Sequence, residues 1–132
     1  MPLIGAVIGA ALQYAFGRSL ETRKQLVVQR AQAYADFFRG FAALAQSRSS
    51  ESLALVADAK TRICIYGSEK VVLALAAFER AGATTLTPEG EATIIDLMRA
   101  MRRDVAQSKA QVPADDLSRV LLGPGPGKRA AK

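Results

Sequence analysis

The stretch that decides the fold covers residues 2–47 and reads PLIGAVIGAALQYAFGRSLETRKQLVVQRAQAYADFFRGFAALAQS. From Pro2 to Gly17 it carries no charged side chain, and Arg18 then opens a basic segment. No proline interrupts it after its first residue, so one helix can run through the whole stretch. Gly17 and Gly40 are its weak points, because glycine disfavours helix interiors. Unbroken, a helix of about 45 residues would be roughly 68 Å long.

The uncharged run predicts a transmembrane anchor over residues 2–20. Its sixteen residues span roughly 24 Å as a helix, whereas the hydrocarbon core of a bilayer is about 30 Å thick. Arg18 can snorkel to the headgroups and the bilayer can thin locally, so the short run still suits an anchor. A cleaved signal peptide is less favoured, since the positive charges follow the apolar run instead of preceding it. A buried helix in a soluble oligomer stays open as an alternative.

The distribution of charge predicts an orientation. Residues 18–30 hold four bases and one acid, and positive charge beside a spanning segment favours the cytoplasmic side. We therefore expect a bacterial inner-membrane protein with its N-terminus outside and its C-terminal domain in the cytoplasm. Arg18, Arg23 and Lys24 are then the expected contacts to lipid headgroups. The single Cys64 fits a reducing compartment, because it has no partner within the chain.

Net charge also bears on the class of partner. The chain carries a formal charge of +6, but residues 31–127 hold eleven bases and eleven acids. A nucleic-acid-binding domain concentrates excess Lys and Arg on its own surface. Here the excess lies beside the anchor and in the tail, so membrane lipid is the expected partner and nucleic acid is not. A weakly basic helical module associated with nucleic acid remains a lesser alternative.

Residues 21–122 predict an all-α bundle of four helices with a short fifth, followed by a flexible basic tail over residues 123–132. The first helix is expected to bury a face of regularly spaced apolar residues, namely Val27, Ala31, Tyr34, Phe38, Phe41 and Ala45. The alternating Gly and Pro of residues 123–127 cannot sustain a helix, which sets the start of the tail.

Start and stop signals divide the rest of the bundle. Ser47, Ser49 and Ser50 supply a break and the start of a second helix that ends at Tyr66 before Gly67, and a third runs from Ser68 to Gly82. A fourth begins at Thr87-Pro88-Glu89 and ends near Lys109, and the fifth follows Pro113. The run Ile63–Tyr66 has strand propensity, but it has no partner strand elsewhere in the chain, so we predict helix there.

The residue inventory argues against catalysis. The chain has no His and one Cys, so no Ser-His or Cys-His couple and no usual zinc set can form. Clustered acids such as Asp115 and Asp116 lie at helix starts, where they complement the helix dipole. Cys64 stands between two isoleucines and is expected to be a buried apolar filler. We therefore expect no enzyme, no metal, no cofactor and no small-molecule substrate.

Two groups of residues are candidate contact sites. Gly5, Gly9, Gln13 and Gly17 recur every four residues, a spacing that lets membrane helices approach closely, with Gln13 able to hydrogen-bond across the pair. This strip predicts association with a second copy or with another membrane protein. The second group is a polar strip on the fourth helix, formed by Arg99, Arg102 and Arg103, which would face a partner or the membrane surface. Asp58 and Arg62, four residues apart, are expected to be an ordinary surface pair.

Three short motifs carry a resemblance to a family. They are Arg30-x-x-x-Tyr34-x-x-Phe37, Ala59-Lys-x-Arg62-Ile-x-Ile-Tyr66-Gly67-Ser68 and Met98-Arg-Ala-Met101-Arg-Arg103-Asp104. In these the chain resembles small bacterial proteins of uncharacterised function. The resemblance implies one N-terminal membrane helix followed by a compact helical domain, and it implies no activity, cofactor or catalytic residue. The resemblance supports this architecture and leaves function open. The residues themselves predict a non-enzymatic accessory or scaffolding protein of the membrane.

Overall fold

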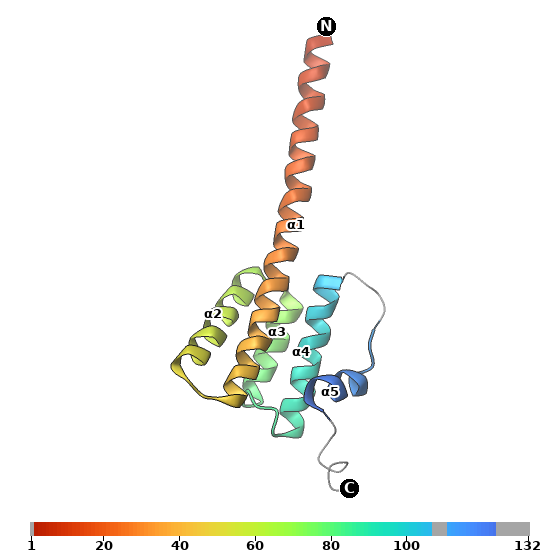
Figure 1. The fold of residues 1–132 in the computed structure, drawn as a ribbon. Coiled ribbons are helices and arrows are strands. Elements are labelled where there is room, and N and C mark those ends of the chain that lie inside the picture. Colours follow the sequence, from red (N-terminus) through yellow and green to blue (C-terminus); the bar gives the residue numbers. More distant parts are fainter. Residues whose placement is uncertain (1, 107–110, 124–132) are drawn as a thin grey trace.

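The computed structural model describes the backbone of residues 2–106 and 111–123, and the side chains of residues 22–106 and 111–123. These residues form five helices and no strand (Figure 1). The helices are α1 (Pro2–Gln46), α2 (Ser50–Tyr66), α3 (Glu69–Arg80), α4 (Pro88–Ala106) and α5 (Ala114–Leu122). The predicted all-α fold is therefore confirmed, and the segment with strand propensity lies inside α2.

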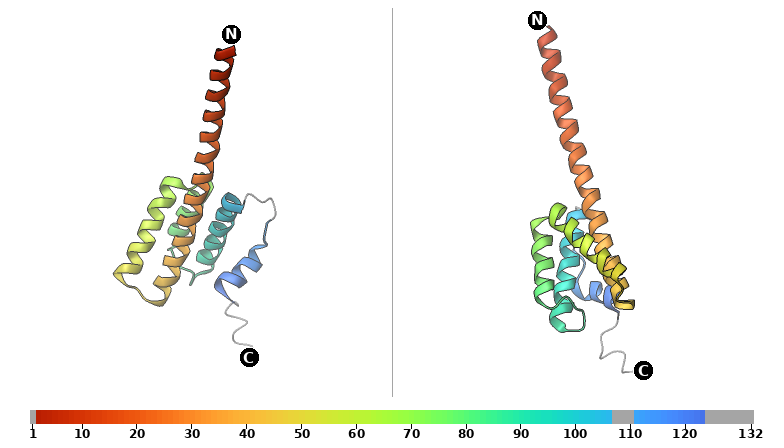
Figure 2. Two further views of the ribbon diagram at one scale, coloured as in Figure 1. Left: turned by 45° about the horizontal axis from the view of Figure 1, so that its top comes forward. Right: turned by 90° about the vertical axis from the view of Figure 1, so that its left-hand side faces the viewer.

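Helix α1 has two parts. Its C-terminal part packs in the bundle, whereas its N-terminal part extends well beyond the other helices (Figures 1 and 2). The predicted continuity is confirmed, since neither Gly17 nor Gly40 breaks the helix. Within the part of the chain that the structure describes, no helix is both long and apolar enough to cross a membrane. The side chains of the predicted anchor, residues 2–20, lie outside the described residues.

The bundle is built from two helix pairs around one core. Helix α1 packs against α2 and α3 against α4, while α1 also contacts α4 and α5 rests on α4. The largest fully buried side chains come from all four long helices and are Phe37, Ile63, Val71, Phe78, Ile94 and Leu97. Phe41 lies edge-on to Phe78 with ring centroids 5.6 Å apart, which is a favourable aromatic geometry and joins α1 to α3.

The buried face of α1 differs from the predicted one. Only Tyr34 of the predicted set is buried, Phe38 and Phe41 are partly buried, and Ala45 is exposed. The fully buried α1 residues are instead Ala33 and Phe37, one turn apart. The prediction was off because α1 contacts both α2 and α4, so its most buried line lies between these neighbours and not along the most regular apolar spacing.

The helix starts follow the capping signals. A side-chain oxygen accepts a hydrogen bond from the backbone N–H three residues further on at each of three starts: Ser49 from Ser52 at 3.1 Å, Ser68 from Val71 at 3.3 Å and Thr87 from Gly90 at 3.0 Å. Helix α3 is followed by Gly82 in the left-handed region with φ 99°, as its predicted closing role requires. Helix α4 ends at Ala106 in the structure, and residues 107–110 lie outside the described ones.

Two glycines allow close approaches that no other residue permits. A Cβ atom on Gly40 would lie 2.8 Å from Val56 Cγ2, so this position sets how near α2 comes to α1. A Cβ atom on Gly90 would lie 1.7 Å from the backbone oxygen of Thr84, where the loop before α4 folds over the helix start. Gly40 has a low helix propensity, but its lack of a Cβ atom allows α1 and α2 to pack closely.

The prediction for Cys64 was wrong. Ile63 is fully buried, but Cys64 is exposed and Ile65 is 66 % exposed. Successive residues of a helix point about 100° apart, so only one member of this apolar run can face the core. Cys64 is therefore open to reagents in solution.

Candidate functional site

The residues predicted to act at the membrane fall into two groups. Gly5, Gly9, Gln13, Gly17 and Arg18 lie in the N-terminal part of α1, where the side chains are outside the described residues. Arg23 and Lys24 are described, and both are exposed. Both lie in α1, a few residues after the predicted anchor.

The three arginines predicted as a polar strip do come together. Arg99, Arg102 and Arg103 border one small hollow of about 20 Å³ beside the segment that leads into α5. Arg99 Nη2 donates a hydrogen bond to Gln111 Oε1 at 3.1 Å, which ties α4 to that segment. Arg102 and Arg103 are exposed, and neither forms an ion pair with any described residue. The cluster therefore presents two positive charges that have no ion-pair partner within residues 22–106 and 111–123.

A second hollow lies between α1 and α4, and the sequence did not predict it. Its volume is about 250 Å³, and its walls are mainly apolar. The lining residues are Ala31, Tyr34, Ala35 and Phe38 from α1, and Met98, Met101, Arg102 and Val105 from α4. Several of these were predicted to face the core. The short side chains of Ala31 and Ala35 were the only available signal, because they leave space between the two helices.

Tyr34 forms a polar junction beneath this hollow. Its hydroxyl donates a hydrogen bond to Asp104 Oδ2 at 2.6 Å and accepts a longer one from the backbone N–H of Ser68 at 3.4 Å. Burial, followed by the hydrogen bond to Asp104, raises the pKa of Tyr34 to about 12. One side chain of α1 thereby fixes the start of α3 and the end of α4.

Other residues of the three short sequence motifs have structural roles of the same kind. Arg30 Nε donates to the backbone oxygen of Tyr66 at 2.6 Å and so holds α1 against the end of α2. Phe37 is fully buried in the core. Together with the Tyr34 junction, these contacts explain the motifs as devices that hold four helices together.

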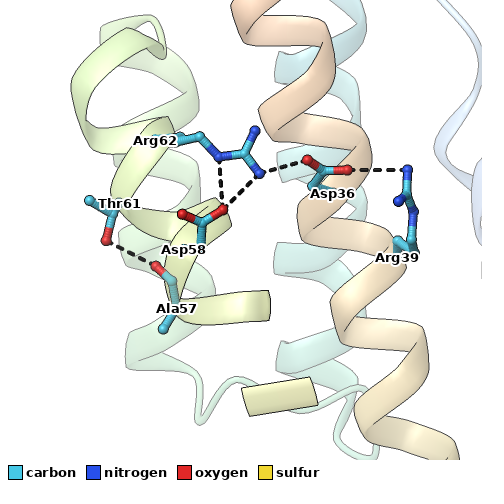
Figure 3. A network of polar contacts seen from close by, with 6 residues as sticks. All are labelled: Asp36, Arg39, Ala57, Asp58, Thr61 and Arg62. Atoms are coloured by element: carbon cyan, nitrogen blue, oxygen red, sulfur yellow. Dashed lines mark hydrogen bonds and ion pairs between the residues drawn. The ribbon is translucent and has the colours of Figure 1, made fainter. Parts of the chain in front are cut away.

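Arg62 joins α1 to α2 through two carboxylates (Figure 3). Its Nη2 lies 2.6 Å from Asp36 Oδ2 on α1 and 3.0 Å from Asp58 Oδ2 on α2, and Asp36 also pairs with Arg39 at 3.2 Å. The hydrogen bond to Asp36 is the main cause that raises the pKa of Arg62. The predicted Asp58–Arg62 pair is present, but Asp36 extends it into an interhelical tie.

In the described ranges, 22–106 and 111–123, no three side chains of His, Cys, Asp or Glu gather as metal ligands would. The described surface offers an apolar hollow, two arginines beside it that form no ion pair with any described residue, and a helix that extends from the bundle. Comparisons of the chain with family models, curated proteins and solved structures find no match.

Proposed function

We propose that this chain is a membrane-anchored accessory or scaffolding protein, in which residues 2–20 hold the helical bundle at the cytoplasmic face of the bacterial inner membrane. One observation carries the proposal. The run without charged residues coincides with the part of α1 that extends beyond the bundle (Figure 1). A helix of such composition is stable in lipid, where all its backbone groups are satisfied internally.

The charges support the same arrangement. Arg18 follows the run directly, and exposed Arg23 and Lys24 follow within the next two turns of α1. Lys24 follows Leu20, the last residue of the proposed anchor, by four residues, and four residues of helix cover about 6 Å. These bases therefore lie where anionic headgroups begin. Each base near such a surface contributes about 1 kcal/mol of attraction. Residues 31–127 are neutral in sum, so the excess of positive charge lies beside the proposed anchor and in residues 128–132.

The scaffolding role rests on helix–helix contact. Gly5, Gly9, Gln13 and Gly17 recur at the spacing of close-packed membrane helices. The proposed partner of this strip is a second copy of the chain or another membrane protein. No reaction is assigned, since His, the residue that serves most often in acid–base catalysis, does not occur in the sequence.

Membrane extraction tests the anchor. We expect the full chain to stay in the membrane fraction through washes with high salt and with alkaline carbonate, and to be released only by detergent. The variant Ile8→Arg should be released, because a charge near the centre of a spanning helix costs about 2.5–3.5 kcal/mol. Leu53→Arg is the matched control, since Leu53 is half exposed on α2. Release of the unaltered chain by salt or carbonate contradicts the anchor and favours the soluble oligomer.

The exposed Cys64 tests the orientation without any added label site. The outer membrane of the cells is permeabilised while the inner membrane stays intact. A membrane-impermeant maleimide should then leave Cys64 unmodified, and it should modify Cys64 after the cells are lysed. Cys64→Ser is the control for background labelling. Modification of Cys64 before lysis overturns the cytoplasmic placement of the bundle while leaving the anchor itself untouched.

A further inference from the structure

The apolar hollow and the arginine cluster are two halves of one surface. Arg102 borders both the hollow between α1 and α4 and the small hollow next to α5. Its side chain therefore stands between an apolar site and a basic site. Such a pairing suits a ligand that has an apolar part and a negative charge side by side.

The larger hollow offers contacts for hydrocarbon. Its volume of about 250 Å³ greatly exceeds the roughly 10–15 Å³ that a single water needs. Tyr34 is its main polar wall, yet the hydroxyl of Tyr34 is already engaged by Asp104 and Ser68. The remaining walls are alanine, phenylalanine, methionine and valine, with Arg102 at the rim.

The smaller hollow offers contacts for an oxyanion. Its volume of about 20 Å³ has room for about one water-sized group, which is the size of a phosphate oxygen. Arg99 is held in place by Gln111. Arg102 and Arg103 remain unpaired among the described residues and can supply charge-assisted hydrogen bonds.

The position of this surface points to the source of the ligand. Helix α4 runs towards the end of the bundle from which α1 extends (Figures 1 and 2). In the proposed membrane arrangement, Arg102 and Arg103, in the last turns of α4, therefore lie on the membrane-facing side. The choice of membrane lipid as the source of the ligand rests on the proposed function.

We propose that the α1–α4 surface binds an anionic phospholipid, with an acyl chain in the apolar hollow and the phosphate at Arg102 and Arg103. Charge complementarity decides between occupants. A second copy of the chain would bring another set of the same arginines and would be repelled, whereas an anionic lipid neutralises them. Binding of this kind holds the bundle against the membrane and fixes which side faces the cytoplasm.

Site-directed quenching tests the proposal in detergent micelles, where no bilayer anchoring is needed. The full chain carries Cys64→Ser and Ala35→Cys, and a bimane fluorophore on the new thiol reports from the wall of the hollow. We expect phosphatidylglycerol with a spin label on its acyl chain to quench this fluorophore more strongly than the equivalent phosphatidylcholine. Ala31→Leu, which fills the hollow, should reduce quenching by both lipids.

The charge variants decide the role of the arginines. Arg102→Gln with Arg103→Gln should lower the apparent affinity for phosphatidylglycerol roughly 25-fold at low salt, because each base near anionic lipid contributes roughly fivefold. Arg48→Gln with Arg80→Gln removes the same charge from exposed positions at the opposite end of the bundle and should change little. Melting curves by circular dichroism establish that each variant is folded.

Three results would overturn the assignment. They are equal quenching by the two lipids, an unchanged preference in the Arg102 and Arg103 variant, and loss of the preference when millimolar inorganic phosphate competes. The last result would assign the arginines to a free anion. None of these bears on carbonate extraction, so failure of lipid binding and failure of the anchor are separate outcomes.

Discussion

Gly40→Ala probes the closest approach of α1 and α2. Gly40 is buried, and a Cβ atom there would lie 2.8 Å from Val56 Cγ2, 3.2 Å from Val56 N and 3.3 Å from Leu55 Cγ. One of these neighbours is backbone, so rotation of a side chain cannot relieve the whole contact. Helix α2 must shift for the methyl group to fit.

Two opposing effects set the magnitude. Alanine is better than glycine inside a helix by about 0.8–1.0 kcal/mol, which favours the variant. Overpacking in a dense core costs about 1–3 kcal/mol. Because the contacts involve a β-branched side chain and a backbone atom, we place the packing cost near the middle of that range. The variant should therefore lose about 1 kcal/mol of its free energy of unfolding.

A double-mutant cycle with Val56→Ala measures the clash directly. Val56→Ala alone should cost about 2 kcal/mol, since it removes two buried methyl groups and leaves a small cavity. In that background the methyl group of Gly40→Ala has space, so the two changes should couple favourably by about 1 kcal/mol. Urea unfolding of the full chain in mild detergent, followed by circular dichroism, gives all four free energies.

The control is Ala42→Gly, at an exposed position of the same helix, which should report helix propensity alone with a loss of about 1 kcal/mol. If Gly40→Ala is instead stabilising by the same amount, propensity alone governs the site. That result, or a coupling of zero with Val56→Ala, would refute the close packing of the two helices.

Three further predictions concern other ties in the bundle. Gly90→Ala should cost about 2–3 kcal/mol in unfolding free energy, because its Cβ would strike the Thr84 carbonyl. Ala92→Gly, exposed on α4, measures helix propensity alone, and a gain from Gly90→Ala as large as the loss from Ala92→Gly would contradict the clash. Since the pKa of Tyr34 rises from 10.0 to about 12, its stabilisation is complete below pH 10 and declines as pH rises through 12. Tyr34→Phe should flatten this alkaline decline in the free energy of unfolding, measured with urea. An unchanged pH profile in the variant would show that the Tyr34 hydrogen bonds do not contribute to stability. Asp36→Asn should lower the free energy of unfolding by about 1 kcal/mol and make it less dependent on salt, because the variant breaks the ion pair between α1 and α2. An unchanged salt dependence would show that this ion pair does not contribute to stability.

The locations of the helices were predictable because their signals are local. Ser49, Ser68 and Thr87 supply the capping oxygens of α2, α3 and α4, and each acts on a backbone N–H only three residues away. The absence of proline between Leu3 and Ser47 likewise governs the continuity of α1 within one segment. Hydrogen bonds of such short range depend little on the rest of the molecule.

The candidate contact surfaces were only partly predictable. Arg99, Arg102 and Arg103 share one helix, so their spacing alone indicated that they would gather. The hollow beside them requires α1 and α4 to lie together, and Ala31 and Met98 are too far apart in the sequence for any periodic pattern to pair them.

By itself the sequence determined the all-α fold, the positions of the helix starts and the separation of basic from neutral segments. Only the tertiary structure decided that Phe37 is buried while Ala45 is exposed, that Cys64 faces outwards, and that Tyr34 meets Asp104 across 70 residues. The physical reason is the range of the forces involved. Backbone hydrogen bonding and charge patterning act along the chain, whereas the rotation of each helix is fixed by packing against neighbours that come from distant parts of it.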